Sequence, residues 1–566
     1  MSGAVHAARK RRCIVTGLAT LLMAGSGAMA QAATLNVSTT SDNTTNDSFC
    51  SLREAILAAN LTPANTNCGT AGSGSNTINL PAGTYVVSVN TPLDVTRTVT
   101  IQGSSMWTTT IRADLTAFHA VGVQAPAGNL TIKDVTLTKG TQSAGVTGIV
   151  IDPGRAATLD HVQVSNFNRR GIFNNVGVLT ITSSTIANNW NDENGGGIAV
   201  FSDESGGSGS GVIVMDKSTV VGNSAVSGNG GGIFRVSNGT DNTTSISNST
   251  FSDNHADLRG GAIFSVAATG QAAYMALYHL TIAHNSAGNS GGGITEDFSA
   301  APSIQCTSSI INDNSAPAAA DVEGEFFTDW CIVTNVDDLY TGWHDTSRVG
   351  AGFNARLGPL MYAGGPTQVF PLTPQPPPLP SPAIDFGSST DGFTVDQRGY
   401  VRPKNGNGGP TPLDDVGAYE YDPAATTFES ENEPMLAKSS DAFTVVTGSS
   451  YSNGKGVNLA SNASGDFVTF PIGVLVDGTY NVKVRVKKGT NEGIFKLTRS
   501  TTLGGAQTLI AQNQDLWATS NTWVELNLGN TALTSGQAFF TFTVTGQNTH
   551  SSSAQLFIDY VKLTKQ

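Results

Sequence analysis

The sequence is poor in charged residues, which make up 13% of its 566 positions, against about 25% in an average soluble domain. Helical bundles and coiled coils need many Glu, Lys and Arg side chains on their wet faces, so this scarcity argues against both classes. Basic residues are the scarcer kind, with 30 Lys and Arg against 43 Asp and Glu and a formal net charge of -13. This balance argues against nucleic acid as a partner.

Long apolar runs are missing too, apart from one stretch near the start of the chain. That stretch begins at Cys13, follows a cluster of basic residues and precedes Ala28-Met29-Ala30. This is the pattern of a secretory signal peptide, here over residues 1–30. No later run approaches the ~18 apolar residues of a membrane span. We therefore expect a secreted or cell-surface protein without a transmembrane segment in the mature chain.

Cysteine is scarce, with five residues, one of them in the predicted signal peptide. An exported chain meets an oxidising compartment, where the remaining four can form two disulfides. Four cysteines allow three pairings. The pairs that are local in sequence, Cys50 with Cys68 and Cys306 with Cys331, are favoured because short loops close most easily.

Glycine is abundant, with 64 residues, and much of it belongs to an internal repeat. Segments ending in asparagine recur about every 30 residues, at Asn189, Asn223, Asn254, Asn285 and Asn314. The first four are followed by a polar turn and a small-residue strand start, which reaches Ile198, Ile233, Ile263 and Ile294. Because both series keep the same phase, they predict a stack of equivalent units.

A unit this short cannot bury a core of its own, but stacked copies share one. We therefore predict an all-β fold whose first part is a right-handed parallel β-helix over residues 77–352, with the asparagines forming a hydrogen-bonded ladder. An open end of such a stack exposes strand edges and needs a cap. Residues 31–76 are expected to supply it, with a helix whose apolar face is formed by Leu52, Ala55, Ile56 and Ala59.

The repeat disappears near residue 428, where alternation with a period of two residues takes over. In the clearest strand one face carries the apolar side chains of Tyr480, Val482, Val484 and Val486. This alternation predicts an antiparallel β-sandwich over residues 428–566.

Several motifs resemble those of known families. The segment CSLREAILAAN, from Cys50 to Asn60, resembles the CSLREA motif of secreted bacterial β-helix proteins, and the repeats resemble those of polymorphic outer-membrane proteins. The segments GGPTQVFPL, SPAIDFG, DQRGYVRP and DVGAYEY resemble the end of choice-of-anchor Q domains, and they place such a segment at 353–427, with a Pro-rich insert at 372–382. These families imply a surface or extracellular protein and say little about activity.

The C-terminal sandwich resembles jelly-roll carbohydrate-binding modules in its first and last strands. In those modules two early acidic residues and a late Asp hold a structural Ca²⁺, and the matching positions here are Glu429, Glu431 and Asp559. Carboxylate oxygens suit Ca²⁺; the alternative is three solvated carboxylates at strand ends.

Sugar recognition in such modules needs an exposed aromatic ring with amides nearby. Trp517, Trp523 and Asn548 are the candidates, and structural packing of each Trp is the alternative.

Polysaccharide lyases and some glycosidases are β-helices, so a column of chemically versatile side chains on the stacked repeats is a candidate active site. One column holds Ser183, Lys217, Asn248, His279 and Ser308, and a second holds Val200, Arg235, Ser265 and Glu296. The catalytic candidates are Lys217, Arg235, Arg259, His279 and Glu296, which we expect to share one face. The alternative is that these charges are part of a solvated outer surface.

Two hypotheses on function follow. The first is a monomeric extracellular protein that recognises a polysaccharide and cleaves it, as a lyase in preference to a glycoside hydrolase. The second is a non-catalytic surface or adhesion protein, favoured by the CSLREA and anchor-like motifs and by the lack of a sharp catalytic constellation.

Overall fold

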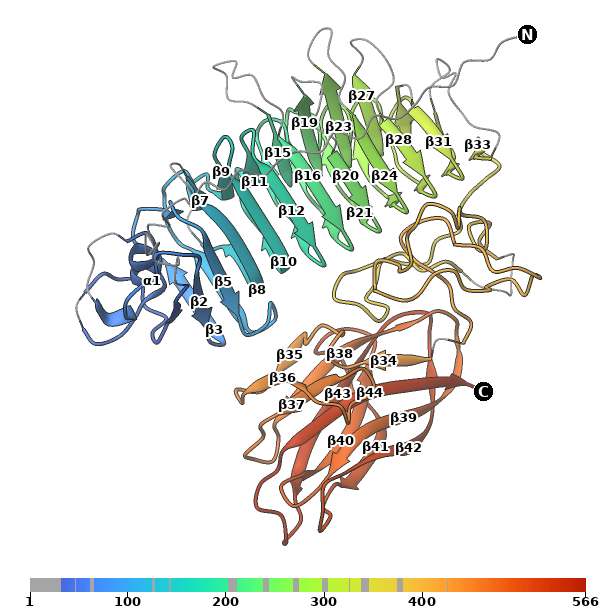
Figure 1. Cartoon of the computed structure of the whole chain (residues 1–566). Helices are drawn as coiled ribbons and strands as arrows, with labels where there is room; N and C mark the ends of the chain where they lie inside the picture. Colours follow the sequence, from blue (N-terminus) through green and yellow to red (C-terminus); the bar gives the residue numbers. More distant parts are fainter. Residues whose placement is uncertain are drawn as a thin grey trace, which may run out of the picture.

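The computed structural model describes residues 32–45, 47–61, 66–124, 128–141, 144–201, 211–237, 244–267, 274–297, 304–324, 326–336, 346–373, 380–424 and 426–566. The predicted signal peptide and residues 374–379 of the Pro-rich insert lie outside these ranges. The described chain is almost wholly β-structure: a long stack of parallel strands is followed by an antiparallel sandwich (Figure 1). The predicted fold class is confirmed.

One sheet of the stack carries the predicted isoleucine column. Among the described residues it contains nine strands, which are β4(Leu93–Val95), β7(His119–Val123), β9(Thr147–Ile151), β11(Arg170–Asn174), β15(Ile198–Val200), β19(Ile233–Ser237), β23(Ile263–Ala267), β27(Ile294–Asp297) and β30(Val322–Glu323). Ile198, Ile233, Ile263 and Ile294 are paired in register and fully buried. The preceding glycines permit tight stacking, since a Cβ on Gly231 would collide with the carbonyl oxygen of His255 in the next coil.

The largest sheet bends, so that most coils cross it with two strands. Its first column contains β1(Thr34–Asn36), β2(Asn76–Leu80), β5(Val99–Gly103), β12(Val178–Thr182), β16(Val212–Asp216), β20(Thr244–Ser247), β24(Met275–Tyr278), β28(Ile304–Thr307) and β31(Phe326–Asp329). Its second column contains β3(Gly83–Val87), β6(Thr109–Ala113), β13(Thr185–Ala187), β17(Thr219–Val221), β21(Thr250–Ser252), β25(Thr281–Ala283), β29(Ile310–Asn312), β32(Ile332–Val333) and β33(Arg348–Val349). The long strands β8(Asn129–Lys139) and β10(Ala156–Ser165) run through both columns.

The bend between the two columns lies at the predicted column of Lys217 and His279. Its residues have left-handed backbone, with φ of 48° at Ser183, 52° at Lys217, 41° at Asn248, 50° at His279 and 48° at Ser308. Pairing of the preceding residues confirms that these positions stack in register. The column is therefore a corner of the β-helix.

The predicted asparagine ladder is confirmed at a second corner. The side-chain Nδ2 of Asn189 donates to Oδ1 of Asn223 at 3.0 Å, and the same bond continues through Asn254 and Asn285 to Asn314 at 2.8 to 2.9 Å. Four short strands follow this ladder: β14(Trp190–Asn191), β18(Ser224–Ala225), β22(His255–Ala256) and β26(Ser286–Ala287).

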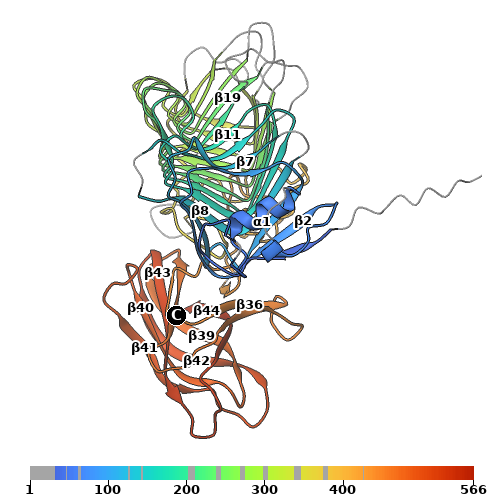
Figure 2. The ribbon, with the colours of Figure 1, turned by 90° about the vertical axis from the view of Figure 1, so that its left-hand side faces the viewer.

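A helix, α1(Leu52–Ala59), covers the N-terminal end of the stack, as Figure 2 shows from that end. The Ser51 side chain accepts from the Glu54 backbone amide, and the Glu54 carboxylate accepts in return from that of Ser51. The apolar face predicted for this helix is buried. A short 3₁₀ turn, η1(Thr66–Cys68), brings Cys68 to Cys50, and the predicted disulfide between them is present. The parallel pairing already begins at β1, inside the segment expected as the cap.

The second predicted disulfide is absent from the structure. Cys306 and Cys331 are buried free thiols whose Sγ atoms lie 3.3 Å apart. Their proximity was predictable from sequence. The two thiols nevertheless contact each other without a covalent bond.

Residues 353–373 and 380–424, the cover segment, fold back along the C-terminal half of the β-helix (Figure 1). Three stacked threonines anchor this segment. Thr219 Oγ1 donates to the Gln368 carbonyl at 2.7 Å, Thr250 Oγ1 donates to Gln397 Oε1 at 2.7 Å, and Thr281 Oγ1 accepts from the Ala418 amide at 3.0 Å. The outer face of β17, β21 and β25 is therefore covered by the chain itself.

The C-terminal sandwich has two antiparallel sheets. One contains β34(Thr427–Glu429), β36(Phe443–Thr447), β37(Lys455–Leu459), β39(Gly478–Lys488), β42(Thr522–Leu533) and β44(Leu556–Lys565). The other contains β35(Ala437–Lys438), β38(Phe467–Val474), β40(Gly493–Ser500), β41(Thr508–Asp515) and β43(Gly536–Gln547). The predicted apolar face of β39 is buried between them. The sandwich also contacts the rest of the chain, since Gln537 Oε1 accepts from the Tyr362 amide at 2.9 Å.

Candidate functional site

Trp517 and Asn548 come together at one end of the sandwich, as the sequence predicted for a sugar site. Asp515 joins them: its Oδ1 accepts from the Trp517 backbone amide at 2.9 Å and its Oδ2 accepts from Asn548 Nδ2 at 2.6 Å. The exposed His550 ring lies beside the indole, with centroids 5.1 Å apart. A half-buried indole thus stands next to an amide, a carboxylate and an imidazole, a combination that can stack on a sugar ring and bond its hydroxyls.

Trp523 belongs to a different place. It lies on β42, where its ring packs against Tyr451 at a centroid distance of 4.6 Å, and the Arg485 guanidinium sits 5.3 Å from its centroid. Arg485 in turn forms an ion pair with Asp559. The structure therefore places Trp523 near Asp559, one of the three predicted calcium ligands, and not with Trp517 and Asn548.

The three predicted calcium ligands gather where the first and last strands pair. Strand β34 lies antiparallel to β44, so Glu429 is placed opposite Tyr560, next to Asp559. Ser452 connects two of the carboxylates, because its Oγ is 2.6 Å from Glu429 Oε2 and 3.0 Å from Asp559 Oδ1. Glu431 Oε1 accepts from Asn453 Nδ2 at 3.2 Å.

The negative charges of Glu429, Glu431 and Asp559 are close together and partly buried, which disfavours the ionised forms of Glu429 and Glu431. Burial, together with the neighbouring carboxylates of Glu429 and Asp559, raises the pKa of Glu431 to about 7. Burial also raises the pKa of Glu429. Glu431 Oε2 is buried without a hydrogen-bond partner among the described residues. An oxygen-rich set of three carboxylates beside a single guanidinium, Arg485, has the donor chemistry that Ca²⁺ prefers.

A polar cleft of about 400 Å³ separates the sandwich from the N-terminal half of the β-helix. Glu431 lines one wall, and the corner residues Asp134 and His161 line the other together with Trp107. Its volume falls within the range of ligand sites, ~300 to 1,000 Å³. Sequence reasoning missed this cleft because it depends on how the two domains dock.

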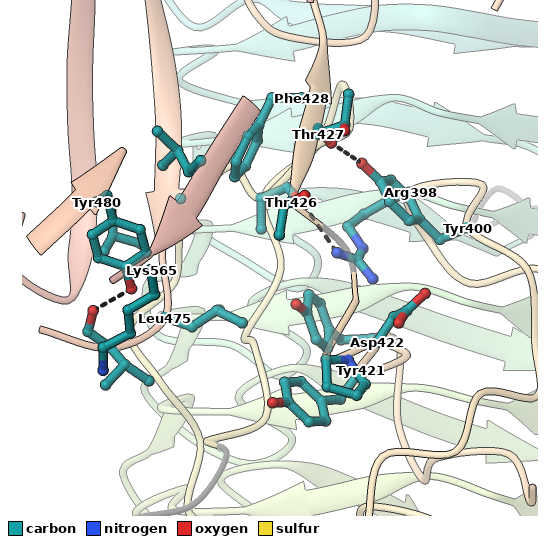
Figure 3. A pocket seen from close by; sticks show the side chains of 17 residues that line it. Arg398, Tyr400, Tyr421, Asp422, Thr426, Thr427, Phe428, Leu475, Tyr480 and Lys565 are labelled. Atoms are coloured by element: carbon teal, nitrogen blue, oxygen red, sulfur yellow. Dashed lines mark hydrogen bonds between the residues drawn. The ribbon is translucent and has the colours of Figure 1, made fainter. Parts of the chain in front are cut away.

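A second cavity, of about 190 Å³, lies between the cover segment and the sandwich (Figure 3). Tyrosine rings dominate its lining, but their hydroxyls bond the protein: Tyr400 Oη donates to the Thr427 carbonyl at 3.1 Å and Tyr480 Oη to the Val476 carbonyl at 2.6 Å. The volume is below that of ordinary ligand sites.

The predicted catalytic residues do not share one face, and that part of the prediction is wrong. Lys217 is partly exposed at the corner and pairs with Asp216 at 3.3 Å. His279 is on the same corner but is fully buried, because the cover segment places Asp391 against it at 2.9 Å. Arg259 lies in the turn between β22 and β23 and pairs with Asp297 at 2.6 Å.

Arg235 and Glu296 point into the β-helix. Arg235 follows Ile233 by two residues on the same strand, so strand alternation directs both side chains inward, and Arg235 is 0% exposed. Ser265 separates Arg235 from Glu296 in the stack. Burial lowers the pKa of Arg235 to about 10, and the charge of Glu296 opposes this shift. A polymer in solvent has no access to the Arg235 side chain, and a catalytic role for the five residues stays a prediction.

The cover segment contributes polar residues that sequence reasoning missed. Asp391 and Asp414 lie against His279, and Arg402 forms a fully buried ion pair with Glu420 at 3.3 Å. Glu420 belongs to the DVGAYEY segment, whereas Asp391 and Asp414 lie outside the motifs. The contact of Asp391 with His279 could not be predicted, because His279 lies 112 residues earlier in the chain.

The described part of the chain contains no helix with the length and apolar character of a membrane span. No protein-family model matches the sequence. No curated protein matches it either.

Several solved structures are similar to parts of the chain. A Paenibacillus xanthan lyase is 30% identical over 27% of this chain and 15% of its own, with a TM-score of 0.24. A Podospora anserina GH26-CBM35 β-(1,4)-mannanase is 18% identical over 25% of this chain and 27% of its own, with a TM-score of 0.19. A family 35 carbohydrate-binding module from Clostridium thermocellum is 17% identical, over 25% of this chain and 99% of its own, with a TM-score of 0.18.

Proposed function

We propose that this chain is an extracellular polysaccharide-binding protein whose C-terminal sandwich holds the glycan. The observation that carries the proposal is the convergence of Trp517, Asn548, Asp515 and His550 at one end of the sandwich. An aromatic face with adjoining hydrogen-bonding groups matches the two-sided chemistry of a sugar, which has apolar C–H faces and a polar rim. In this proposal the β-helix is a rigid support.

Replacing Trp517 by Ala is expected to weaken binding to the preferred polysaccharide about tenfold or more, since losing about 1.4 kcal/mol of stacking has that effect. Affinity electrophoresis or calorimetry against a polysaccharide panel measures it. Trp190→Ala is the matched control, because Trp190 is an exposed Trp, 40% accessible, that lies on the β-helix. Unchanged binding after Trp517→Ala, or equal loss in the control, would rule this site out.

The same incubations separate binding from cleavage. A lyase creates unsaturated ends that absorb in the ultraviolet together with new reducing ends, whereas a hydrolase creates reducing ends alone. Neither signal is expected if the protein only binds, as a surface or adhesion protein does. The same polysaccharide panel therefore tests binding, lyase cleavage and hydrolysis together.

We further propose that Glu429, Glu431 and Asp559 hold a structural Ca²⁺. The ion would add positive charge beside carboxylates that Arg485 offsets only in part. Ca²⁺ at a hundredfold above its Kd should stabilise the sandwich by about 2.7 kcal/mol. Melting of the full chain with calcium and with chelator should show this difference.

Asp559→Asn is expected to remove the calcium effect on melting. Asp441→Asn, at a separate surface carboxylate on the sandwich, is the control and should retain it. Coincident curves for the parent chain with calcium and with chelator would mean that the cluster is a set of surface charges.

A further inference from the structure

A second cluster of possible metal ligands lies at the junction of the β-helix and the cover segment. His279 projects from the corner between β24 and β25, and two carboxylates of the cover segment approach it. His279 Nε2 lies 2.9 Å from Asp391 Oδ2 and 4.0 Å from Asp414 Oδ2. The side chains are 0%, 7% and 1% exposed, respectively. Among the described residues this is the one group of three such ligands whose donor atoms lie within 4.8 Å of one another.

The carboxylate of Asp414 is the anomalous member. Both of its oxygens are buried, and neither has a hydrogen-bond partner among the residues that the structure describes. A buried carboxylate without partners is strongly unfavourable. Asp391, by contrast, accepts from the Phe393 amide at 3.3 Å as well as from the imidazole. One of these unpartnered oxygens, Oδ2, lies 4.0 Å from His279 Nε2.

Charge in this junction is unbalanced. Arg402 is close enough to influence all three side chains, but it forms an ion pair with Glu420 and donates to the carbonyls of Asp415 and Gly417. Asp391 and Asp414 are two carboxylates against one buried imidazole. Binding of a metal ion displaces the imidazole proton that faces Asp391, and the lone pair of that nitrogen then becomes a ligand.

We propose that His279, Asp391 and Asp414 bind one divalent transition-metal ion such as Zn²⁺. Imidazole nitrogen and carboxylate oxygen are both Zn²⁺ ligands, at about 2.0 to 2.2 Å from the ion. Two such donors around one ion are therefore separated by about 3 to 3.5 Å. The observed separations of 2.9 and 4.0 Å bracket this range, so a small movement of Asp414 completes the set.

The ion would join segments that are far apart in the chain. His279 and Asp391 are 112 residues apart, and Asp414 belongs to a third stretch beside the buried Arg402–Glu420 pair. A bound metal adds its binding free energy to the docked state, because the separated segments do not form the site. The site therefore fastens the cover segment to the β-helix. This inference is independent of the proposed glycan binding.

The test uses the full chain after chelation, with Ca²⁺ held constant and Zn²⁺ added as the probe. Wild-type protein should retain about one equivalent of zinc after gel filtration, and its melting temperature should rise by several degrees. His279→Asn and Asp414→Asn should each lower zinc affinity at least tenfold and remove the shift. His279→Asn is compatible with the fold because Asn248 occupies the equivalent left-handed corner of the preceding coil.

Controls distinguish this site from others in the chain. His255→Asn removes an exposed imidazole that pairs with Asp257 at 3.0 Å, and zinc binding should persist. Co²⁺ substitution should give visible bands without an intense sulfur charge-transfer band, which separates the site from Cys306 and Cys331. If Asp414→Asn fails to fold, Asp391→Asn takes its place.

Zinc that is retained equally by the variants, a thiolate-type Co²⁺ spectrum, or wild-type melting that ignores zinc would overturn the proposal. Loss of the calcium effect through Asp559→Asn should leave the zinc effect intact, so the two metal proposals can fail separately.

Discussion

Replacing Ile263 by Asp should unfold the β-helix. Ile263 is 0% exposed and is paired in register with Ile233 and Ile294 in the neighbouring coils. The substitution places an unpaired carboxylate in a shared apolar core, which costs about 4 kcal/mol or more. Because each coil is a template for the next, the loss extends beyond one unit. Urea unfolding followed by circular dichroism should show a large drop in midpoint or no folded baseline.

Val214→Asp is the matched control for this experiment. Val214 lies on β16 in the same β-helix, but its side chain points outward and is 42% exposed. That variant should unfold close to the parent, whereas Ile233→Asp should behave like Ile263→Asp. A parent-like melting curve for Ile263→Asp would show that the register of the coils is misassigned.

Replacing Asn254 by Ala is expected to destabilise the β-helix by about 3 kcal/mol or more. The side chain of Asn254 accepts from the backbone amide and Nδ2 of Asn223, and it donates to Asn285 Oδ1 and to the Val220 carbonyl. Alanine leaves these buried partners without their bonds. Water cannot replace them easily, since Asn223, Asn254 and Asn285 are all 0% exposed.

Asn289→Ala supplies the comparison, because Asn289 is exposed and takes part in the turn through its backbone. Chemical denaturation of both variants measures the difference. Equal stability of the two variants would mean that the ladder contributes nothing beyond ordinary turn geometry.

The repeat phase was predictable because it is a local property. The asparagines and the isoleucines recur at matched intervals, and each interval maps onto one coil. The inward direction of Arg235 was also within reach: it stands two residues after Ile233, and strand alternation gives the two side chains the same face. The predicted catalytic face needs Arg235 to point outward, which this alternation excludes.

The burial of His279 could not be predicted from the repeats. Its corner position is equivalent to those of Lys217 and Asn248, and nothing in the repeat distinguishes it. Its environment is set by Asp391 and Asp414, whose docking on the β-helix is a long-range event. The acidic cluster of the sandwich was easier to predict, since first and last strands that pair bring Glu429 close to Asp559.

The cover segment has a consequence for the order of assembly. Thr219 bonds Gln368, which lies 149 residues later in the chain, and Thr250 bonds Gln397, which lies 147 residues later. The coils are synthesised before the cover segment. The β-helix can therefore form while the outer face of β17, β21 and β25 is still uncovered. Contacts between residues so far apart in the sequence form slowly. Until they form, the uncovered face can associate with other chains. Chaperone demand should therefore peak after the last coil and fall once residue 418 has reached Thr281.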